Sequence, residues 1–245
     1  MNEMSDRLYK TIKYRGFSIN IHCDNMAENP ANEWYMLGTI VNWGKYIIGK
    51  GENVFNCANG AIEHILSDLG IEYSDDDIEY DDAKELWNKY AKRIQEKAVI
   101  LPIYIYDHSG ITINTQEFHC QWDSGQIGFV YVSKEAVKKE WEWKLISKKR
   151  REHIEGILKA NIAVIDDYLR GNVFGYMIEP MNANNKIECD DSCCGYYGND
   201  MEKNGLLETA KGQIRWCIEH YRTVVKERYE RGRQMDSFMR NHWAC

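Results

Sequence analysis

The stretch "ILPIYIYDHSGITINTQEFHCQWDSGQIGFVYVSK", residues 100–134, contains the pattern that decides the fold. Residues 99–106 are almost continuously apolar and partly β-branched, which is typical of a strand buried on both faces. Residues 111–115 alternate apolar and polar side chains, and residues 128–132 form a third apolar run. We therefore expect three strands separated by two polar turns that are rich in titratable side chains.

Amphipathic segments and further strands surround this stretch. Apolar side chains recur at helical spacing in residues 58–69, 82–97, 148–169 and 205–235. Further strands are expected at residues 17–22, 36–43, 172–180 and 186–198, with residues 46–48 as a hairpin partner of the second. The acidic residues 74–82 are expected to form a loop that leads into the next helix. The pattern predicts an α+β fold with a mixed, mainly antiparallel sheet covered by amphipathic helices.

Length and composition limit the possible classes of protein. The chain has 245 residues, of which 44% are hydrophobic and 28% are charged, and its net charge is −7. We expect a single domain spanning residues 1–245, with residues 1–50 as a possible small N-terminal sheet. The negative charge argues against direct nucleic-acid binding. The sequence shows no membrane span, and its first residues lack the apolar core of a signal peptide, so a cytoplasmic location is expected.

The cysteines do not form a recognisable metal motif. There are eight of them, and none stands in a C-x-x-C pair. His119 and Cys120 could bind a metal with Cys193 and Cys194, but neighbouring residues tend to point apart. No metal and no cofactor are therefore predicted.

The first candidate site is the turn at residues 107–110. Asp107 beside His108 can orient an imidazole or act as a general base. Adjacent residues on an extended backbone point to opposite sides, however, so Asp107, His108 and Ser109 do not make a triad by themselves. The alternative is a structural turn in which Asp and Ser bond backbone amides and Gly110 takes a positive φ.

The second candidate site is "FHCQWDSGQIG", residues 118–128. It converges on the first turn if the strands at 100–106 and 128–132 are neighbours. Asp107, His108, Asp123 and Ser124 would then be candidate catalytic groups for acid–base chemistry or a nucleophilic hydroxyl. No G-x-S-x-G elbow is present, which disfavours a familiar serine hydrolase.

The third candidate site is "CDDSCCGYYGND", residues 189–200. A nucleotide base could stack on one of its tyrosines, or the segment could be a strand end leading into the last helix. The candidate binding residues, taken over all three sites, are Ser109, His119, Trp122, Asp191, Ser192, Tyr196 and Tyr197. A basic cluster at residues 146–152 could touch phosphates or form a solvated face.

Four segments carry a resemblance to a known family. They are "ILPIYIYDHSGITINT", "WDSGQIGFVYVSKE", "YLRGNVFGYMIE" and "DSCCGYYGNDMEKNGLLETAK". They resemble uncharacterised proteins encoded by phages and conjugative elements of Firmicutes, over residues 98–213 and more weakly over residues 32–41. The sequence departs from that family where Gln121 replaces a usual proline and Cys194 a usual tryptophan.

The resemblance implies a biological context. Small accessory proteins of phages often counter host immunity, including CRISPR effectors, restriction enzymes and nucleotide-signalling systems. The first expectation is therefore an inhibitor that binds a host defence protein or its nucleic-acid complex in the bacterial cytoplasm. The alternative is a hydrolase or nucleotide-processing enzyme that uses the four catalytic candidates. A third possibility is a protein that sequesters a nucleotide signal between aromatic side chains and the basic cluster.

Overall fold

The computed structural model describes residues 7–120, 122–182, 187–189 and 191–243, and only the backbone of residues 236–243. The chain forms two compact units. The central unit consists of residues 28–170, and the terminal unit joins residues 1–27 to residues 171–245. The expectation that the whole chain acts as a single domain stays a prediction.

The central unit is built on a sheet whose strands follow the order β4-β3-β7-β5-β6. The long strands β5 (Ala98–Asp107) and β7 (Ser124–Ser133) pair antiparallel along most of their length. β6 (Ile111–Asn114) pairs antiparallel with β5, and β3 (Thr39–Trp43) pairs antiparallel with β7. β4 (Val54–Phe55) is parallel to β3. The three strands expected within residues 99–134 are confirmed, and two of them are the predicted neighbours.

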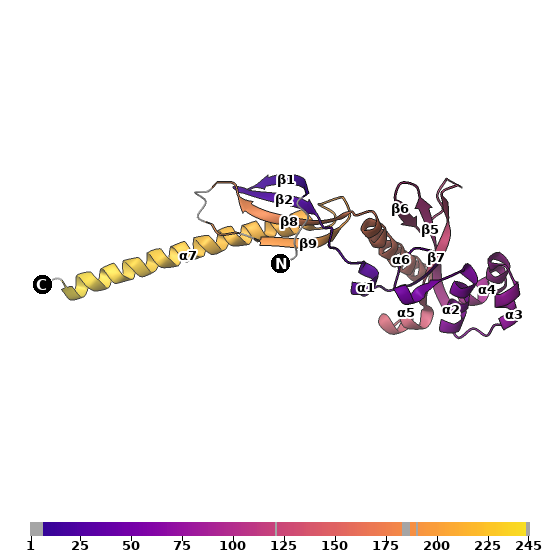
Figure 1. Cartoon of the computed structure of the whole chain (residues 1–245). Helices are drawn as coiled ribbons and strands as arrows, with labels where there is room; N and C mark the ends of the chain where they lie inside the picture. Colours follow the sequence, from indigo (N-terminus) through magenta and orange to yellow (C-terminus); the bar gives the residue numbers. More distant parts are fainter. Residues whose placement is uncertain (1–6, 121, 183–186, 190, 244–245) are drawn as a thin grey trace. The chain divides into compact units, whose positions relative to one another are not determined.

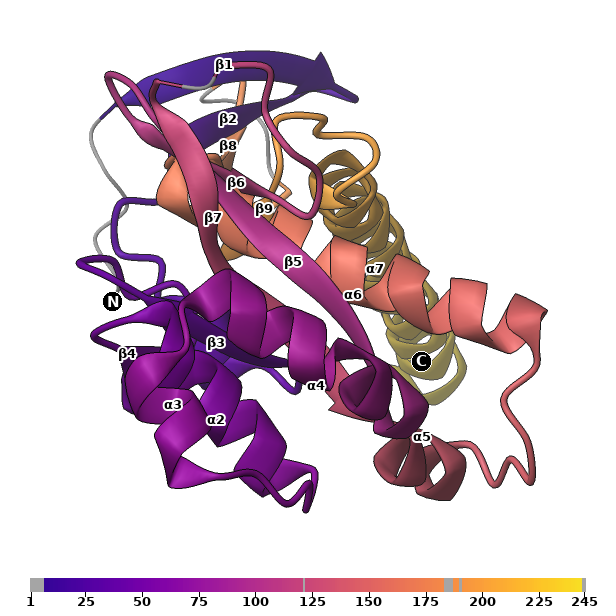
Figure 2. The same ribbon diagram turned by 90° about the vertical axis from the view of Figure 1, so that its right-hand side faces the viewer.

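Both faces of the central sheet are buried, which explains the continuous apolar run in β5. Val99 and Ile103 join one core with α6 (Lys148–Leu169), while Ala98 and Ile100 join a second core with α2 (Ala58–Asp68) and α4 (Ala83–Lys97). Figure 2 shows α2, α4 and the short α3 (Asp75–Tyr80) gathered on one side of this sheet. The α+β class, with a mixed, mostly antiparallel sheet and amphipathic helices, is confirmed.

Smaller elements complete the central unit. The short helix α1 (Pro30–Glu33) starts at an Asn29 cap, and the 3-10 turn η1 (Gly51–Asn53) precedes β4. α5 (Lys134–Glu140) follows β7 directly, with the Ser133 hydroxyl accepting from the Ala136 amide. Ser147 caps α6 in the same way, through the Arg150 amide. These caps satisfy backbone donors that a helix start leaves unpaired.

The terminal unit contains an antiparallel sheet in the order β1-β2-β8-β9. Its strands are β1 (Leu8–Tyr14), β2 (Phe17–Cys23), β8 (Val173–Pro180) and β9 (Asp191–Tyr197). The 38-residue helix α7 (Leu206–Trp243) covers the sheet with Leu206, Ala210 and Ile214, and then continues beyond it (Figure 1). The predicted strand pair within residues 172–198 and the predicted final helix are confirmed. None of the helices that the structure describes is long and apolar enough to cross a bilayer.

Two local expectations are wrong. Residues 46–48 are not a hairpin strand, because β3 pairs with β7 and β4 instead. Residues 75–80 form the helix α3 rather than a loop, since three acidic residues in its first turn favour a helix N-terminus. The strands expected at residues 17–22 and 36–43 are divided between the two units, as β2 in one sheet and β3 in the other, and β1 was not predicted.

Candidate functional site

The turn between β5 and β6 is a tight reversal of the chain. Ser109 has φ 57° and Gly110 has φ 151°, and the His108 amide donates to the Gly110 carbonyl over 3.2 Å. A serine rarely adopts a positive φ, so the turn is held by the strand pairing on either side of it. Asp107, His108 and Ser109 are all exposed. The turn chemistry expected from the sequence is present, and it presents polar side chains on a rigid base.

The two predicted turns meet. The Asp107 amide donates to the Asp123 carbonyl over 2.8 Å, one step beyond the pairing of Tyr106 with Ser124. His108 Nδ1 lies 3.2 Å from Asp123 Oδ2. The imidazole ring also lies 6.0 Å from the Tyr106 ring, centroid to centroid. His108 and Asp123 therefore form a surface pair in which a carboxylate orients an imidazole.

Asp107 is directed to different partners. Its Oδ2 accepts a short hydrogen bond from the Tyr46 hydroxyl and lies 3.4 Å from Lys45 Nζ. The tyrosine hydroxyl, and secondly the lysine, lower the pKa of the Asp107 carboxyl below its usual value. Conversely, the pKa of Lys45 is raised by Tyr46 and Asp107. The carboxylate of Asp107 is thus held ionised by Tyr46 and Lys45, whereas His108 pairs with Asp123.

A buried asparagine builds the loop that supplies these partners. Asn42 is fully buried at the end of β3. Its Nδ2 donates to the Tyr46 carbonyl over 2.7 Å, and its Oδ1 accepts from the Ile48 amide over 3.4 Å. The sequence pattern predicted that residues 46–48 would form backbone hydrogen bonds as a hairpin strand. The Asn42 side chain makes hydrogen bonds to the backbone of this loop instead, so no paired strand is needed there.

Ser124 does not contribute a free nucleophile. Its hydroxyl donates a short hydrogen bond to the Cys120 carbonyl, which closes the loop before β7. The Cys120 thiol in turn lies 3.8 Å from Asp123 Oδ2. The four catalytic candidates are therefore neighbours, but they divide into a His108–Asp123 pair, an outward-bonded Asp107 and a loop-closing Ser124.

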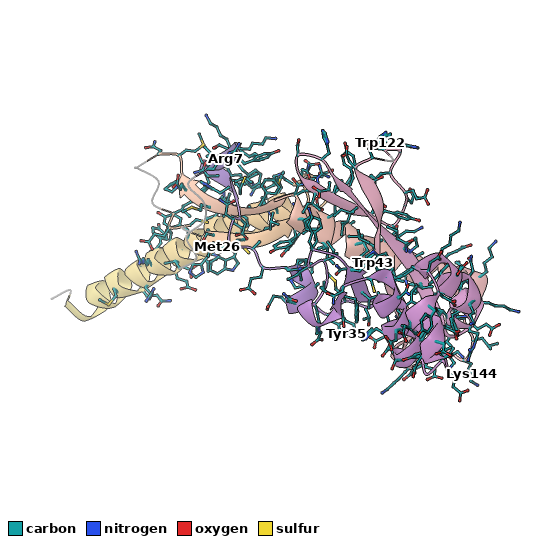
Figure 3. The ribbon with its side chains drawn as sticks, turned by 45° about the vertical axis from the view of Figure 1, so that its right-hand side comes forward. Arg7, Met26, Tyr35, Trp43, Trp122 and Lys144 are labelled. Atoms are coloured by element: carbon teal, nitrogen blue, oxygen red, sulfur yellow. The ribbon has the colours of Figure 1, made fainter. Side chains whose placement is uncertain are left out.

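Trp122 is the most exposed large apolar side chain of the loop before β7. Its side chain is 95% exposed, and Figure 3 shows it at the outer end of the loop. His119, in the same loop, is also exposed. Gln121, where the resemblance leads us to expect a proline, lies outside the described residues. The predicted binding residues Ser109, His119 and Trp122 thus belong to one pair of adjoining loops, named here the tip loops, which consist of residues 107–110 and the described residues 118–120 and 122–124.

The remaining predicted binding residues lie in β9 of the terminal unit. Asp191 accepts from the Ser192 amide over 2.9 Å, and Ser192 pairs with Met177 of β8. Tyr196 packs 6.0 Å from Tyr176, centroid to centroid, and burial raises its pKa. Tyr197 is partly buried opposite Val173. The segment is a paired strand that leads towards α7, which is the structural alternative left open by the sequence.

The basic cluster at residues 146–152 and the candidate metal ligands do not extend the candidate site at the tip loops. Arg150 lies over the Trp143 ring at 4.5 Å, and Arg151 Nε pairs with Glu155 at 2.9 Å. Two of the cluster's cations are therefore engaged within the central unit. Among the described residues, no group of three or more His, Cys, Asp or Glu side chains is placed to hold a metal ion.

Sequence reasoning missed a pocket on the α2–α4 side of the central sheet. Its volume is about 490 Å³, and Trp43, Trp87 and Phe129 contribute its aromatic walls. It is named the aromatic pocket here. The sequence does indicate one wall of the pocket, because Ile100, Pro102 and Tyr104 are spaced two residues apart and so share one face of β5. It does not show that β3 and α4 place their side chains opposite this face.

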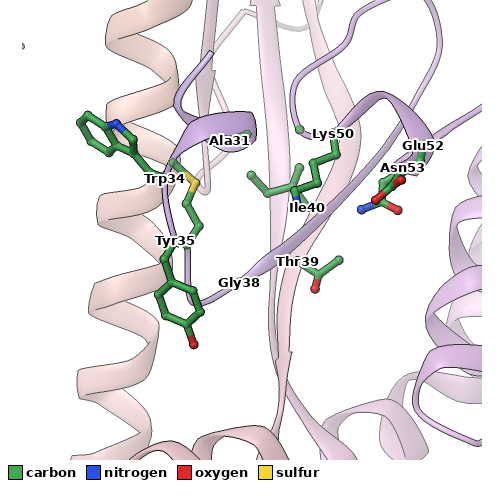
Figure 4. Close-up of a pocket in the computed structure, with 11 residues that line it drawn as sticks. Ala31, Trp34, Tyr35, Gly38, Thr39, Ile40, Lys50, Glu52 and Asn53 are labelled. Atoms are coloured by element: carbon green, nitrogen blue, oxygen red, sulfur yellow. The ribbon is translucent and has the colours of Figure 1, made fainter. Parts of the chain in front are cut away.

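A second pocket, of about 360 Å³, lies beside α1 and β3. Figure 4 shows Trp34 and Tyr35 on one side of it and Lys50, Glu52 and Asn53 on the other. Its lining mixes a cation, a carboxylate and an amide, so it has no evident preference for one charge.

The tip loops thus offer exposed hydrogen-bonding groups and one exposed indole, and the aromatic pocket offers apolar walls. These features are the candidate binding surfaces of the central unit. Comparison with protein-family models, with curated proteins and with solved structures finds no match for this chain.

Proposed function

We propose that the chain is an accessory protein of a mobile genetic element that inhibits a host defence system by binding its effector. The single observation that carries the proposal is the 95% exposed indole of Trp122 on a loop tied to two paired strands. Tryptophan is the side chain most enriched among residues that dominate binding energy, and an exposed one on a rigid base suits a partner's pocket.

The tip loops are organised before binding. The Asp107 amide to Asp123 carbonyl bond, the His108–Asp123 pair and the bond from Ser124 to the Cys120 carbonyl all fix them. A fixed loop loses less conformational freedom on association than a loose one, so more of the contact energy appears as affinity. Ser109 and His119 are exposed in the same pair of loops and supply hydrogen-bonding groups.

The charge of the central unit supports an effector with a basic surface. Residues 28–170 contain 24 acidic and 17 basic residues, which accounts for the whole net charge of −7, whereas the terminal unit has 14 of each. An acidic surface attracts a partner's nucleic-acid groove and competes with its natural ligand. Such effectors act in the bacterial cytoplasm, which is where we place this activity. The family resemblance of the motifs in residues 98–213 points to the same context.

The proposal is tested by phage plaquing on bacteria that carry individual defence systems, with and without this chain. Expression of the wild-type protein should restore plaques against at least one system. Trp122→Ala should abolish the rescue and weaken capture of that system's effector at least about tenfold. Trp216→Ala removes a 59% exposed indole from the terminal unit and serves as the matched control. Rescue by Trp122→Ala equal to wild type, or no rescue of any system, would contradict the proposal.

An enzymatic activity is the second candidate, and the His108–Asp123 pair favours it. An exposed imidazole oriented by a carboxylate can act as a general base on a bound substrate. Ser124 is better assigned to closing the loop, so water is the expected nucleophile. The test is hydrolysis of bis-p-nitrophenyl phosphate and p-nitrophenyl acetate by wild type, His108→Gln and Asp123→Asn. Activity that persists in His108→Gln, or is absent from wild type, would rule this candidate out.

A further inference from the structure

We propose that the aromatic pocket binds an uncharged planar heteroaromatic ring system of one or two fused rings. The proposal is independent of the inhibitor function proposed above, which rests on the tip loops. The volume of about 490 Å³ falls within the usual range of small-molecule sites.

The walls of the pocket have the geometry that planar rings prefer. Trp87 and Phe129 are stacked with centroids 4.6 Å apart and an interplanar angle of 16°. The ring centroids of Trp43 and Phe129 are 5.9 Å apart, and the angle between the two ring planes is 54°. A further ring in this cavity meets aromatic faces and edges together, and stacked or tilted contacts of this kind are favoured beyond simple burial.

The pocket exists because the helical layer ends before the strand does. Ile100 is covered by the core that α2 and α4 share, while Pro102 and Tyr104 lie further along the same face of β5 and line the cavity. Ala58 and Ala83 are the first residues of α2 and α4, and both line the cavity too. Small side chains at the two helix starts leave the space open.

Polar groups at the lining can recognise the edge of a ring. Gln126 donates from Nε2 to the Gly128 carbonyl over 3.3 Å, which fixes the direction of its amide. Tyr104 donates to Glu117 over 3.1 Å. Lys84 is the one charged residue among the described residues that line the pocket. A heterocycle with an acceptor atom on its edge can accept a hydrogen bond from the second N–H of Gln126 or from the Lys84 ammonium, and one with a ring N–H can donate to the Tyr104 oxygen. A hydrocarbon ring makes none of these hydrogen bonds.

The surrounding charge decides against an anionic ligand. Lys84 stands in the sequence between Asp82 and Glu85. Residues 58–97, which include α2, α3 and α4, contain 11 acidic and 5 basic residues. The resulting negative field repels phosphate and carboxylate groups. An uncharged ring is therefore favoured over its phosphorylated counterpart.

The test is isothermal titration calorimetry of the full chain with adenosine, quinoline, adenosine monophosphate and ribose. Adenosine or quinoline should bind, ribose should not, and adenosine monophosphate should bind at least about threefold more weakly than adenosine at low ionic strength. Ala58→Leu fills the cavity and should weaken ring binding at least about tenfold. Ala136→Leu makes the same change at an exposed position of α5 and should leave ring binding unchanged.

A second variant keeps the test independent of folding. Lys84→Gln should weaken adenosine binding about fivefold, whereas Lys92→Gln, an equal change at an exposed position of α4, should not. The proposal is overturned if neither ring binds at about 1 mM. It is also overturned if folded Ala58→Leu binds as wild type does, or if adenosine monophosphate binds as tightly as adenosine. Trp122→Ala should bind the rings normally, so the two proposals fail separately.

Discussion

At the scale of single residues, the strand geometry of Asp107 and His108 separates their roles. Neighbouring side chains leave an extended backbone in opposite directions, so Asp107 reaches Tyr46 and Lys45 while His108 reaches Asp123. A carboxyl whose pKa is lowered on folding stabilises the protein above its unfolded pKa and loses that contribution as the pH falls through its folded pKa.

Asp107→Asn should therefore lower the melting temperature at neutral pH by an amount that shrinks as the pH falls below about 4. Tyr46→Phe removes the principal donor and should reproduce part of the loss. Melting curves followed by circular dichroism across this pH range measure both effects. A difference that stays constant down to the lowest pH would show that the Asp107 charge is not its source.

Gly128 allows the backbones of β7 and β3 to lie close together. A Cβ at this position would lie 2.5 Å from the Val41 carbonyl oxygen of the neighbouring strand. Gly128→Ala should consequently cost about 1–3 kcal/mol of unfolding free energy, because the backbone of β3 must shift. Gly125→Ala, in the same strand, meets nothing within 4 Å and should cost less than about 0.5 kcal/mol. Urea unfolding compares the two, and equal losses would contradict the clash.

At the scale of elements, the edge strand β6 is held by a side chain from α6. Asp166 Oδ1 accepts from the Ile113 amide over 2.8 Å and from the Thr112 hydroxyl over 2.6 Å. The carboxylate occupies donors that an edge strand would otherwise expose to other chains. Asp166→Ala should speed amide exchange in residues 111–114 and cost about 1–3 kcal/mol, while Thr112→Val should cost less. Unchanged exchange in Asp166→Ala would contradict this role.

The periodicity of apolar residues predicted most helices and strands. It did not predict where side-chain hydrogen bonds hold a loop in place of a strand. The continuous apolar run at residues 99–106 and the helical spacing at residues 148–169 depend on burial alone, so the sequence reveals them. Residues 46–48 look like a strand because Ile48 is buried, yet Asn42 satisfies their backbone and makes them a loop. The meeting of the two turns followed from the pairing of β5 with β7. The aromatic pocket did not, since it needs side chains from three strands and two helices.

α7 divides into a packed part and an exposed part. Ile214 is fully buried against the terminal sheet, whereas Val225 is 44% exposed and Tyr229 is 67% exposed. Ile214→Ala should cost about 2–4 kcal/mol, because it leaves a cavity in the core. Val225→Ala should stay within about 0.5 kcal/mol. Urea unfolding of both variants measures the contrast, and a large loss in Val225→Ala would indicate that another chain covers that face.

At the scale of the whole molecule, charge is divided unequally between the two units. The central unit carries the entire net charge of −7, and the terminal unit is balanced. The first unit repels a polyanion, and the second gives it little attraction. Nucleic-acid binding is favoured when Lys and Arg side chains displace the counterions that are condensed on the phosphates.

The full chain should therefore bind short duplex or single-stranded DNA with a dissociation constant weaker than about 10⁻⁴ M at about 0.15 M salt. Fluorescence anisotropy with labelled oligonucleotides measures it, and a basic nucleic-acid-binding protein is the positive control. The contrary result is that the chain binds DNA with a micromolar dissociation constant and with an affinity that falls steeply as salt is added. In that case the acidic surface is not the one that contacts the partner. The proposed competition for a basic groove would then fail, while the role of Trp122 as an anchor would still be decided by Trp122→Ala.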